Sequence, residues 1–204
     1  RNTRYYKNLP EIRSLDDLRK IPILTKRGIR DNFEKMIAAN VAGFKVSTSG
    51  TVSKSTTIKD NRLKFDFGEQ RFMNWYGTPF KRICELYQDK HLGSVPRLMG
   101  RYLYLPRMGL RTREDAINYL GWIERFKPDL IKTYAQMMRF LAHYALEEGI
   151  QLKVGVIQTN SEILFPEARE EIEEAFQCEV YNFYGSRELG SMAQDCEQHC
   201  DIHI

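Results

Sequence analysis

The chain has few cysteines, no long apolar run and only a small excess of positive charge. Four cysteines in 204 residues are too few to build a fold on disulfide bonds. No apolar stretch approaches the roughly 18 residues that a membrane-spanning helix requires. The start of the chain also lacks the basic segment and apolar core of a secretory signal. We therefore expect a cytoplasmic protein without a membrane span.

The net charge is only +4, but the arginines are unevenly distributed. They gather around the apolar segment at residues 102–106: Arg97, Arg101, Arg107, Arg111 and Arg113. Basic residues interleaved with aromatic ones are able to bind single-stranded nucleic acid. A β-hairpin whose arginines extend around an apolar strand explains the same pattern, and we favour it over a nucleic-acid partner. A third alternative is an anionic acceptor, such as the phosphates of CoA or an acidic sugar.

The most informative motif is the segment VSTSGTVSKS at residues 46–55. It reads as a short β-branched strand followed by a turn that is rich in hydroxyl groups. Gly50 allows the backbone to approach a ligand closely or to adopt positive φ. The hydroxyls of Ser49 and Thr51 donate to phosphate oxygens, and Lys54 supplies a mobile positive charge. This combination suits a polyphosphate, whereas the simpler alternative is a solvated loop.

A second motif, VYNFYGSRELG, occupies residues 180–190. An apolar, aromatic run typical of a buried strand ends in a glycine turn that carries an arginine and a carboxylate. Tyr184, beside the amide of Asn182, is able to stack on a purine and hydrogen-bond its edge. Glu188, just past the turn, is able to hold the magnesium ion that accompanies ATP. The alternative is a core strand followed by a surface turn with a solvated charge pair.

Together the two motifs resemble those of the adenylate-forming superfamily, which contains the acyl-CoA synthetases. Residues 49–54 are similar to its phosphate loop, and residues 182–188 are similar to its N-x-Y-G-x-T-E motif. Residues 154–162 resemble the strand and turn that end in a glutamate near the adenine, here Glu162. The chain looks most like the phenylacetate–CoA ligase branch, which also contains proteins assigned to capsular polysaccharide synthesis. The resemblance spans nearly the whole chain, with the motifs in the same order.

Three positions depart from the family pattern. Ser53 stands where the phosphate loop has its second glycine, and Ser55 stands where it has proline. Arg187 replaces the threonine that in the family touches the α-phosphate. Arginine is able to serve there as a forked cation. The alternative is a member with altered nucleotide use or without activity.

The resemblance implies ATP-dependent activation of a carboxylic acid as an acyl-adenylate, followed by transfer to CoA or another acceptor. The catalytic residues that it implies are Glu188, Lys54 and Arg187. The nucleotide-binding residues that it implies are Ser49, Gly50, Thr51, Glu162, Asn182, Tyr184, Gly185 and Ser186. A catalytically silent binding or assembly protein on the same fold, for example in polysaccharide synthesis, is the alternative function. The oligomeric state stays open, and a homodimer is one possibility.

Length predicts that the chain is an internal piece of a larger enzyme, because adenylate-forming enzymes are much longer than 204 residues. We expect residues 1–204 to be part of the N-terminal AMP-binding domain, without the small C-terminal domain. The ribose-binding aspartate of the family and the lysine of that small domain would lie beyond residue 204. This piece alone is therefore expected to be inactive.

The order of sequence patterns predicts an α/β fold, with a largely parallel sheet flanked by helices. Residues 160–162 and 185–188 follow the ends of two predicted strands, where ligands gather in parallel sheets. Helices are expected from Ser14, from Thr25 to about Met36, over most of 61–90, and at 112–126, 135–148 and from Pro166. Strands are expected at 44–47, 55–59, 129–133, 154–158 and 179–184.

The last residues offer two thiols and two imidazoles within eight positions: Cys196, His199, Cys200 and His203. Tetrahedral zinc takes such ligands, and its role here would be structural. The alternative is that Cys200 and His203 simply lie in a strand.

Overall fold

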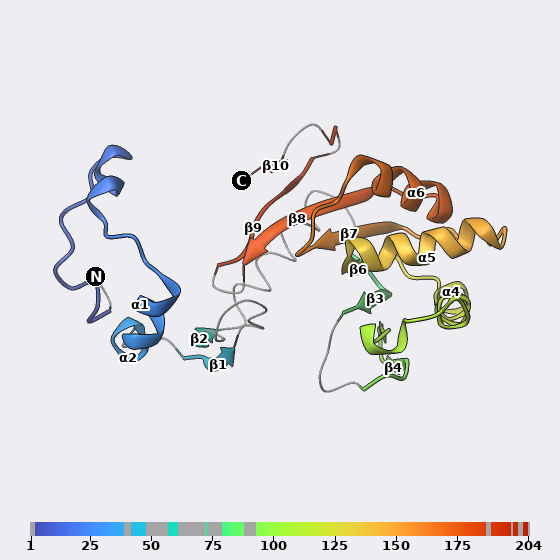
Figure 1. Ribbon diagram of the computed structural model, residues 1–204, viewed down its shortest axis with the longest axis horizontal. Helices are drawn as coiled ribbons and strands as arrows, with labels where there is room; N and C mark the ends of the chain where they lie inside the picture. Colours follow the sequence, from blue (N-terminus) through green and yellow to red (C-terminus); the bar gives the residue numbers. More distant parts are fainter. Residues whose placement is uncertain are drawn as a thin grey trace. The chain divides into compact units, whose positions relative to one another are not determined.

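The computed structural model describes most of the chain. The chain divides into two compact units, Arg1–Phe67 and Gly68–Ile204. Figure 1 shows the helices and strands of each unit. The described residues are 3–38, 42–47, 57–60, 72, 79–87, 93–186, 189–196, 198–199 and 202–203. No helix among them is long and apolar enough to cross a membrane.

The first unit holds short helices and one β-hairpin. Thr25 caps its helix as predicted, since its Oγ accepts a hydrogen bond from the Gly28 nitrogen at 3.0 Å. The short helix predicted from Ser14 is present and begins at Asp16, and Oδ2 of Asp17 accepts from the Ser14 nitrogen at 3.0 Å, as in one half of a capping box. Val46 pairs with Ile58 in the antiparallel hairpin. The elements are η1 (Asp16–Lys20), α1 (Lys26–Asp31), α2 (Phe33–Met36), β1 (Phe44–Ser47) and β2 (Thr57–Asp60).

The second unit is built on one sheet of eight strands among the described residues, in the order β10-β9-β8-β7-β6-β3-β5-β4. The run from β8 through β7, β6 and β3 to β5 is parallel. Strands β9, β10 and β4 are antiparallel and lie toward the two edges. The predicted α/β fold with a largely parallel sheet is therefore confirmed. The strands are β3 (Ile83–Leu86), β4 (Arg97–Met99), β5 (Tyr102–Tyr104), β6 (Leu130–Tyr134), β7 (Val156–Asn160), β8 (Val180–Ser186), β9 (Gly190–Asp195) and β10 (Ile202–His203).

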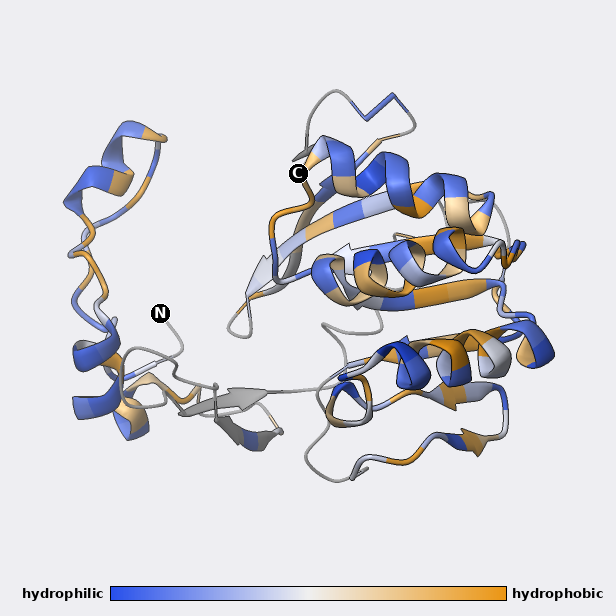
Figure 2. Cartoon of the chain, turned by 45° about the vertical axis from the view of Figure 1, so that its right-hand side comes forward, coloured by the Kyte–Doolittle hydropathy of each residue, from blue (hydrophilic) through white to orange (hydrophobic). Residues whose placement is uncertain are grey.

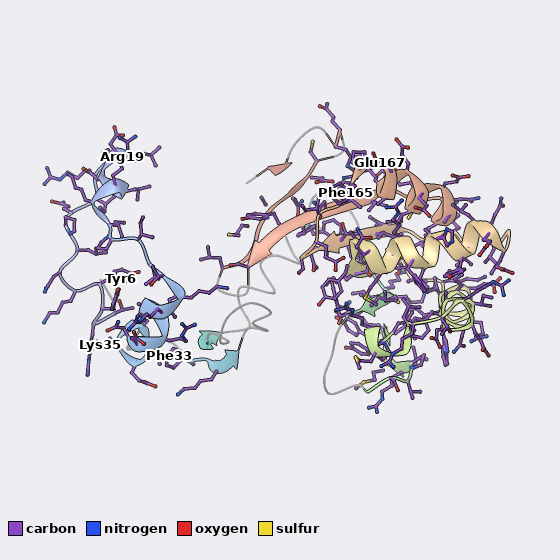
Figure 3. All side chains as sticks on the ribbon, viewed as in Figure 1. Tyr6, Arg19, Phe33, Lys35, Phe165 and Glu167 are labelled. Atoms are coloured by element: carbon purple, nitrogen blue, oxygen red, sulfur yellow. The ribbon has the colours of Figure 1, made fainter. Side chains whose placement is uncertain are left out.

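Three helices, α4 (Arg113–Phe126), α5 (Ala135–Glu147) and α6 (Pro166–Phe176), lie on one side of this sheet (Figure 1). Thr112 and Asp115 form the predicted capping box of α4. The backbone bonds that Asp115 accepts hold the pKa of its carboxyl below the usual value. Each helix carries both hydrophilic and hydrophobic residues (Figure 2), as expected for helices with one buried face.

Apolar side chains cover both faces of the sheet, because successive residues of a strand point to opposite sides. Ile131 of β6 and Ile157 of β7 belong to the cluster that packs against the helices. Leu130 and Val156, one position earlier in each strand, belong to a second cluster on the opposite face. That second cluster also contains Phe72, the one described residue within 61–78.

The prediction of a mainly helical segment at 61–90 is wrong at its end, where residues 83–86 form strand β3. Asp129 explains part of the difference, since its Oδ2 accepts from the backbone nitrogens of Lys81 and Arg82 at 2.9 and 2.8 Å. This contact with a residue far along the chain sets β3 beside β6. The arginine-rich segment forms the antiparallel hairpin of β4 and β5, in agreement with the simpler interpretation of its pattern.

Candidate functional site

The carboxyl ends of the parallel strands bring side chains from distant parts of the sequence into one row. Tyr134 at the end of β6 pairs in register with Asn160 at the end of β7. Asn160 in turn pairs with Phe183 of β8. Tyr87 directly follows β3, the neighbour of β6 on the other side. Ligands of α/β sheets gather at such an edge, so we take this row as the candidate site.

Tyr87, Tyr134 and Asn160 form a polar and aromatic cluster in this row. Asn160 donates from Nδ2 to the Tyr87 hydroxyl at 2.7 Å. The rings of Tyr87 and Tyr134 meet edge to face, with centroids 5.2 Å apart. Burial raises the pKa of Tyr87 far above its usual value, so the phenol stays neutral. Its O–H is therefore kept as a hydrogen-bond donor.

Sequence reasoning missed Tyr87, because it lies within the segment predicted to be helical. The signal that points to it is its position directly after the short apolar run ICEL at residues 83–86. Ile83, Cys84 and Leu86 of this run are fully buried. An aromatic residue that follows a buried strand lies at the ligand-binding edge of a parallel sheet.

Glu162 lies in the turn that follows β7, after Ser161 in a left-handed conformation with φ of 64°. Its Oε2 accepts a hydrogen bond from the backbone nitrogen of Gln136, in the first turn of α5, at 2.9 Å. The carboxylate thus connects the ends of β6 and β7. It also lines a shallow recess of about 180 Å³ with Arg107, Leu110, Gln136, Met137 and Phe140.

Strand β8 carries the second sequence motif. Asn182 accepts from the Thr159 hydroxyl of β7 at 3.2 Å through its side-chain oxygen. Tyr184 is 59% exposed. The ladder with β9 is irregular at Tyr184 and Gly185, and such bulges change the direction in which a side chain points. Ser186 accepts from the Leu189 nitrogen at 3.1 Å and closes the turn.

Five of the predicted site residues belong to the described part of the chain: Glu162 in the turn after β7, and Asn182, Tyr184, Gly185 and Ser186 within β8. The phosphate-loop residues Ser49, Gly50, Thr51 and Lys54 lie outside the described residues, as do Arg187 and Glu188. Their roles stay predictions. The assignment of residues 1–204 to part of an N-terminal AMP-binding domain also stays a prediction.

Zinc at the end of the chain is not supported by the described residues. They contain no group of three or more histidine, cysteine, aspartate or glutamate side chains that could hold a metal ion. His199 lies with its Nδ1 2.9 Å from Nη1 of Arg169, from which it accepts a hydrogen bond. Cys200 and the side chain of His203 lie outside the described part.

Comparison with known proteins gives relatives that are distant in sequence. No family model matches the chain. Protein CapK of Staphylococcus aureus is 24% identical over 192 residues, which cover 84% of this chain and 41% of that protein. The chain therefore spans about two-fifths of the length of this curated relative.

Comparison with solved structures finds proteins of similar fold at low sequence identity. An open conformation of 2-hydroxyisobutyryl-CoA ligase, in complex with 2-HIB-AMP and CoA, matches with a TM-score of 0.65 at 19% identity. The match covers 93% of this chain and 49% of the ligase. Brucella canis acyl-CoA synthetase matches with a TM-score of 0.52 at 19% identity, over 75% of this chain and 29% of the synthetase. The chain has the fold of the adenylate-forming enzymes to which these acyl-CoA ligases belong.

Proposed function

We propose that the complete protein activates a carboxylic acid with ATP to form an acyl-adenylate, and then transfers the acyl group to CoA or another acceptor. The observation that carries this proposal is the row of Tyr134, Asn160 and Phe183 across neighbouring parallel strands. Asn182 directly precedes Phe183 in β8, and Tyr184, which directly follows it, is exposed. The 2-hydroxyisobutyryl-CoA ligase with the same fold was solved with an acyl-adenylate and CoA.

In the proposed reaction a carboxylate oxygen attacks the α-phosphorus of ATP, and the bond to the β-phosphate breaks to release pyrophosphate. The exposed ring of Tyr184 stacks on the adenine, and Asn182 hydrogen-bonds its edge. Arg187 or Ser186 faces the α-phosphate in this proposal. The protein acts by positioning the reactants and by stabilising charge at the phosphates.

The phosphate loop supplies the remaining contacts in this proposal. Ser49, Thr51 and Lys54 hold the outgoing phosphates through hydroxyl groups and one ammonium, with Gly50 allowing close approach. Glu188 would hold the magnesium ion, which neutralises phosphate charge when bound.

The acid is proposed to enter beside Tyr87, Tyr134 and Asn160. Tyr87 keeps a neutral O–H, which is a suitable donor to a carboxylate oxygen. The recess beside Glu162 is lined by both apolar and polar residues, among them Phe140 and Arg107. This lining favours a small acid with an apolar part and a polar substituent.

Titration of the complete protein with ATP and magnesium is the first test, followed by pyrophosphate release with a panel of carboxylic acids. We expect Glu188→Gln to lower acyl-adenylate formation at least ~100-fold, because it removes one electrostatic stabiliser. Glu174→Gln, a change on the acidic helix α6, is the matched control and should leave the rate unchanged. Unchanged pyrophosphate exchange in Glu188→Gln would contradict the assignment of Glu188.

A silent binding or assembly protein, for example in polysaccharide synthesis, is the second candidate function. The serines at positions 53 and 55 and Arg187 favour it, because they depart from the pattern of active members. The absence of measurable ATP binding by the complete protein would decide in favour of this candidate. Zinc bound at Cys196, His199, Cys200 and His203 is a separate proposal, which metal analysis of the purified protein tests.

A further inference from the structure

A side chain extends the pairing between β8 and β9 beyond the last backbone pair. The regular register ends where Phe183 lies opposite Gln194. One position further, Asp195 accepts the backbone N–H of Asn182 through Oδ2, at 3.0 Å. The carboxylate therefore fixes the main chain at Asn182, two residues before Tyr184.

Arg169 of helix α6 holds this carboxylate in place. Its guanidinium donates to Oδ2 of Asp195 and to the carbonyl oxygen of Val180, the first residue of β8. It also donates to Nδ1 of His199 at 2.9 Å. The side chains of Arg169 and Asp195 are only 18% and 6% exposed. A buried carboxylate without its cation is costly, so the pair depends on both partners.

The network secures one end of the short segment that faces the candidate site. The N–H of Asn182 is held by Asp195, and its side-chain oxygen is held by Thr159 at 3.2 Å. Two residues later the ladder shifts register, because Tyr184 pairs with Ala193 whereas Gly185 pairs with Ser191. A bulge leaves the local direction of the strand less constrained by its neighbour. Asp195, together with the pairing to β7, thus fixes the backbone of β8 directly before this irregular stretch.

We propose that Arg169 and Asp195 are positioning residues for the nucleotide base, acting through the backbone of Asn182. This inference rests on the proposed function, because it assigns the base to Asn182 and Tyr184. In this proposal neither Arg169 nor Asp195 touches the nucleotide, because both act through the backbone of β8. Their effect should therefore fall on the affinity for the base and on the discrimination between bases, and not on the affinity for phosphates.

The test compares variants of the complete protein by calorimetric titration with ATP, GTP and pyrophosphate in the presence of magnesium. For Asp195→Asn we expect about tenfold weaker binding of ATP and a similar loss of preference for ATP over GTP, because the base is misplaced. The affinity for pyrophosphate should stay unchanged. Arg169→Lys keeps the positive charge but loses the forked guanidinium that donates to two acceptors. It should weaken ATP binding and base preference in the same direction as Asp195→Asn, but by less.

Glu173→Gln is the matched control. Glu173 also lies on α6 and accepts a backbone N–H of β8, that of Val180 at 3.1 Å, but two residues further from the site. It should leave the preference for ATP over GTP unchanged. Hydrogen exchange of the peptide at residues 181–184 should be faster in Asp195→Asn than in this control.

The results of these titrations distinguish failure of the proposed function from failure of the positioning role. If the wild-type protein binds no ATP, the proposed function fails and this inference fails with it. If the wild type binds ATP but Asp195→Asn keeps its ATP affinity and base preference, the positioning role is wrong while the proposed function stands. Equal losses in Asp195→Asn and Glu173→Gln, or a loss of pyrophosphate binding, would also overturn the positioning role.

Discussion

Oε2 of Glu162 lies 2.9 Å from the backbone nitrogen of Gln136, so the turn after β7 caps helix α5. Tyr134, the N-cap residue of α5, makes no side-chain cap hydrogen bond within the described structure. The carboxylate of a neighbouring segment replaces the missing cap and places a negative charge at the positive end of the helix. Glu162 is therefore structural as well as a candidate nucleotide-binding residue.

Replacing Glu162 should lower the stability of the fold. We expect Glu162→Ala to reduce the free energy of unfolding by about 1 kcal/mol, the usual cost of losing a helix cap. Glu162→Gln keeps an acceptor and should lose less. Glu147→Ala, at the far end of the same helix, is the control and should not destabilise. Urea denaturation measures all three, and equal losses for Glu162→Ala and Glu147→Ala would contradict the capping role.

Gln194 should be replaceable with a gain in stability. It is 1% exposed, and neither Nε2 nor Oε1 has a hydrogen-bond partner in the described part of the chain. A buried amide without partners costs free energy, so we expect Gln194→Met to raise the free energy of unfolding by about 1 kcal/mol. Thermal or urea denaturation of the 204-residue chain measures this change. A clear loss of stability would mean that the amide has a partner in solution.

Gly155 is required by close packing rather than by its backbone angles. A Cβ at this position would lie 2.3 Å from the carbonyl oxygen of Asp129. We therefore expect Gly155→Ala to cost about 1–3 kcal/mol of unfolding free energy, as for other overpacked sites. Gly121 of α4 is the matched control, because a Cβ there would meet only Nη1 of Arg125, at 3.7 Å.

Gly121→Ala should stabilise the chain by up to about 1 kcal/mol, since alanine favours a helix more than glycine does. The two variants are compared in the same denaturation experiment. If Gly155→Ala and Gly121→Ala change the free energy of unfolding in the same direction, the contact with Asp129 does not account for the glycine at position 155.

Cys178 should react slowly with alkylating reagents at neutral and mildly alkaline pH. Burial, and to a lesser extent the charges of Glu173 and Glu179, raise the pKa of its thiol to about 12. At pH 8 the thiolate fraction is then only ~10⁻⁴, and the thiolate is the reactive form. Mass spectrometry after iodoacetamide treatment should show Cys178 alkylated far faster in urea than in the folded chain.

The raised pKa of the Cys178 thiol also affects the stability of the fold. The pKa of the Cys178 thiol is higher in the folded chain than in the unfolded chain. The neutral thiol therefore contributes to the free energy of unfolding in full when the pH is below the pKa of the unfolded chain. This contribution is lost as the pH rises toward 12. Rapid labelling of Cys178 in the folded chain at pH 8 would contradict the shift.

Local signals in the sequence were sufficient for several elements. Thr112 and Pro166 mark the starts of α4 and α6, and the structure places both helices there. A cap or an N-terminal proline acts on the next few residues alone, so neighbouring residues contain the required information. The alternation of strands and helices from residue 129 onward likewise predicted the parallel sheet.

The contacts of Asp129 and Asp195 could not be predicted in this way. Asp129 holds the start of β3 across 47 and 48 positions of sequence. Asp195 depends on the pairing of β8 with β9 and on an arginine from α6. The sequence pattern indicates that such strands are buried, but it does not give their register or the side chains that meet across it. The same limit explains why Tyr87 was missed.

Asp195 accepts a hydrogen bond from the backbone N–H of Asn182, so this contact does not depend on which side chain is at position 182. Under the proposed function, a substitution at Asn182 would change the contact with the base while Asp195 still holds the backbone of the strand. The residue that fixes the backbone, Asp195, and the residue proposed to contact the base, Asn182, are therefore separate, so position 182 is free to diverge.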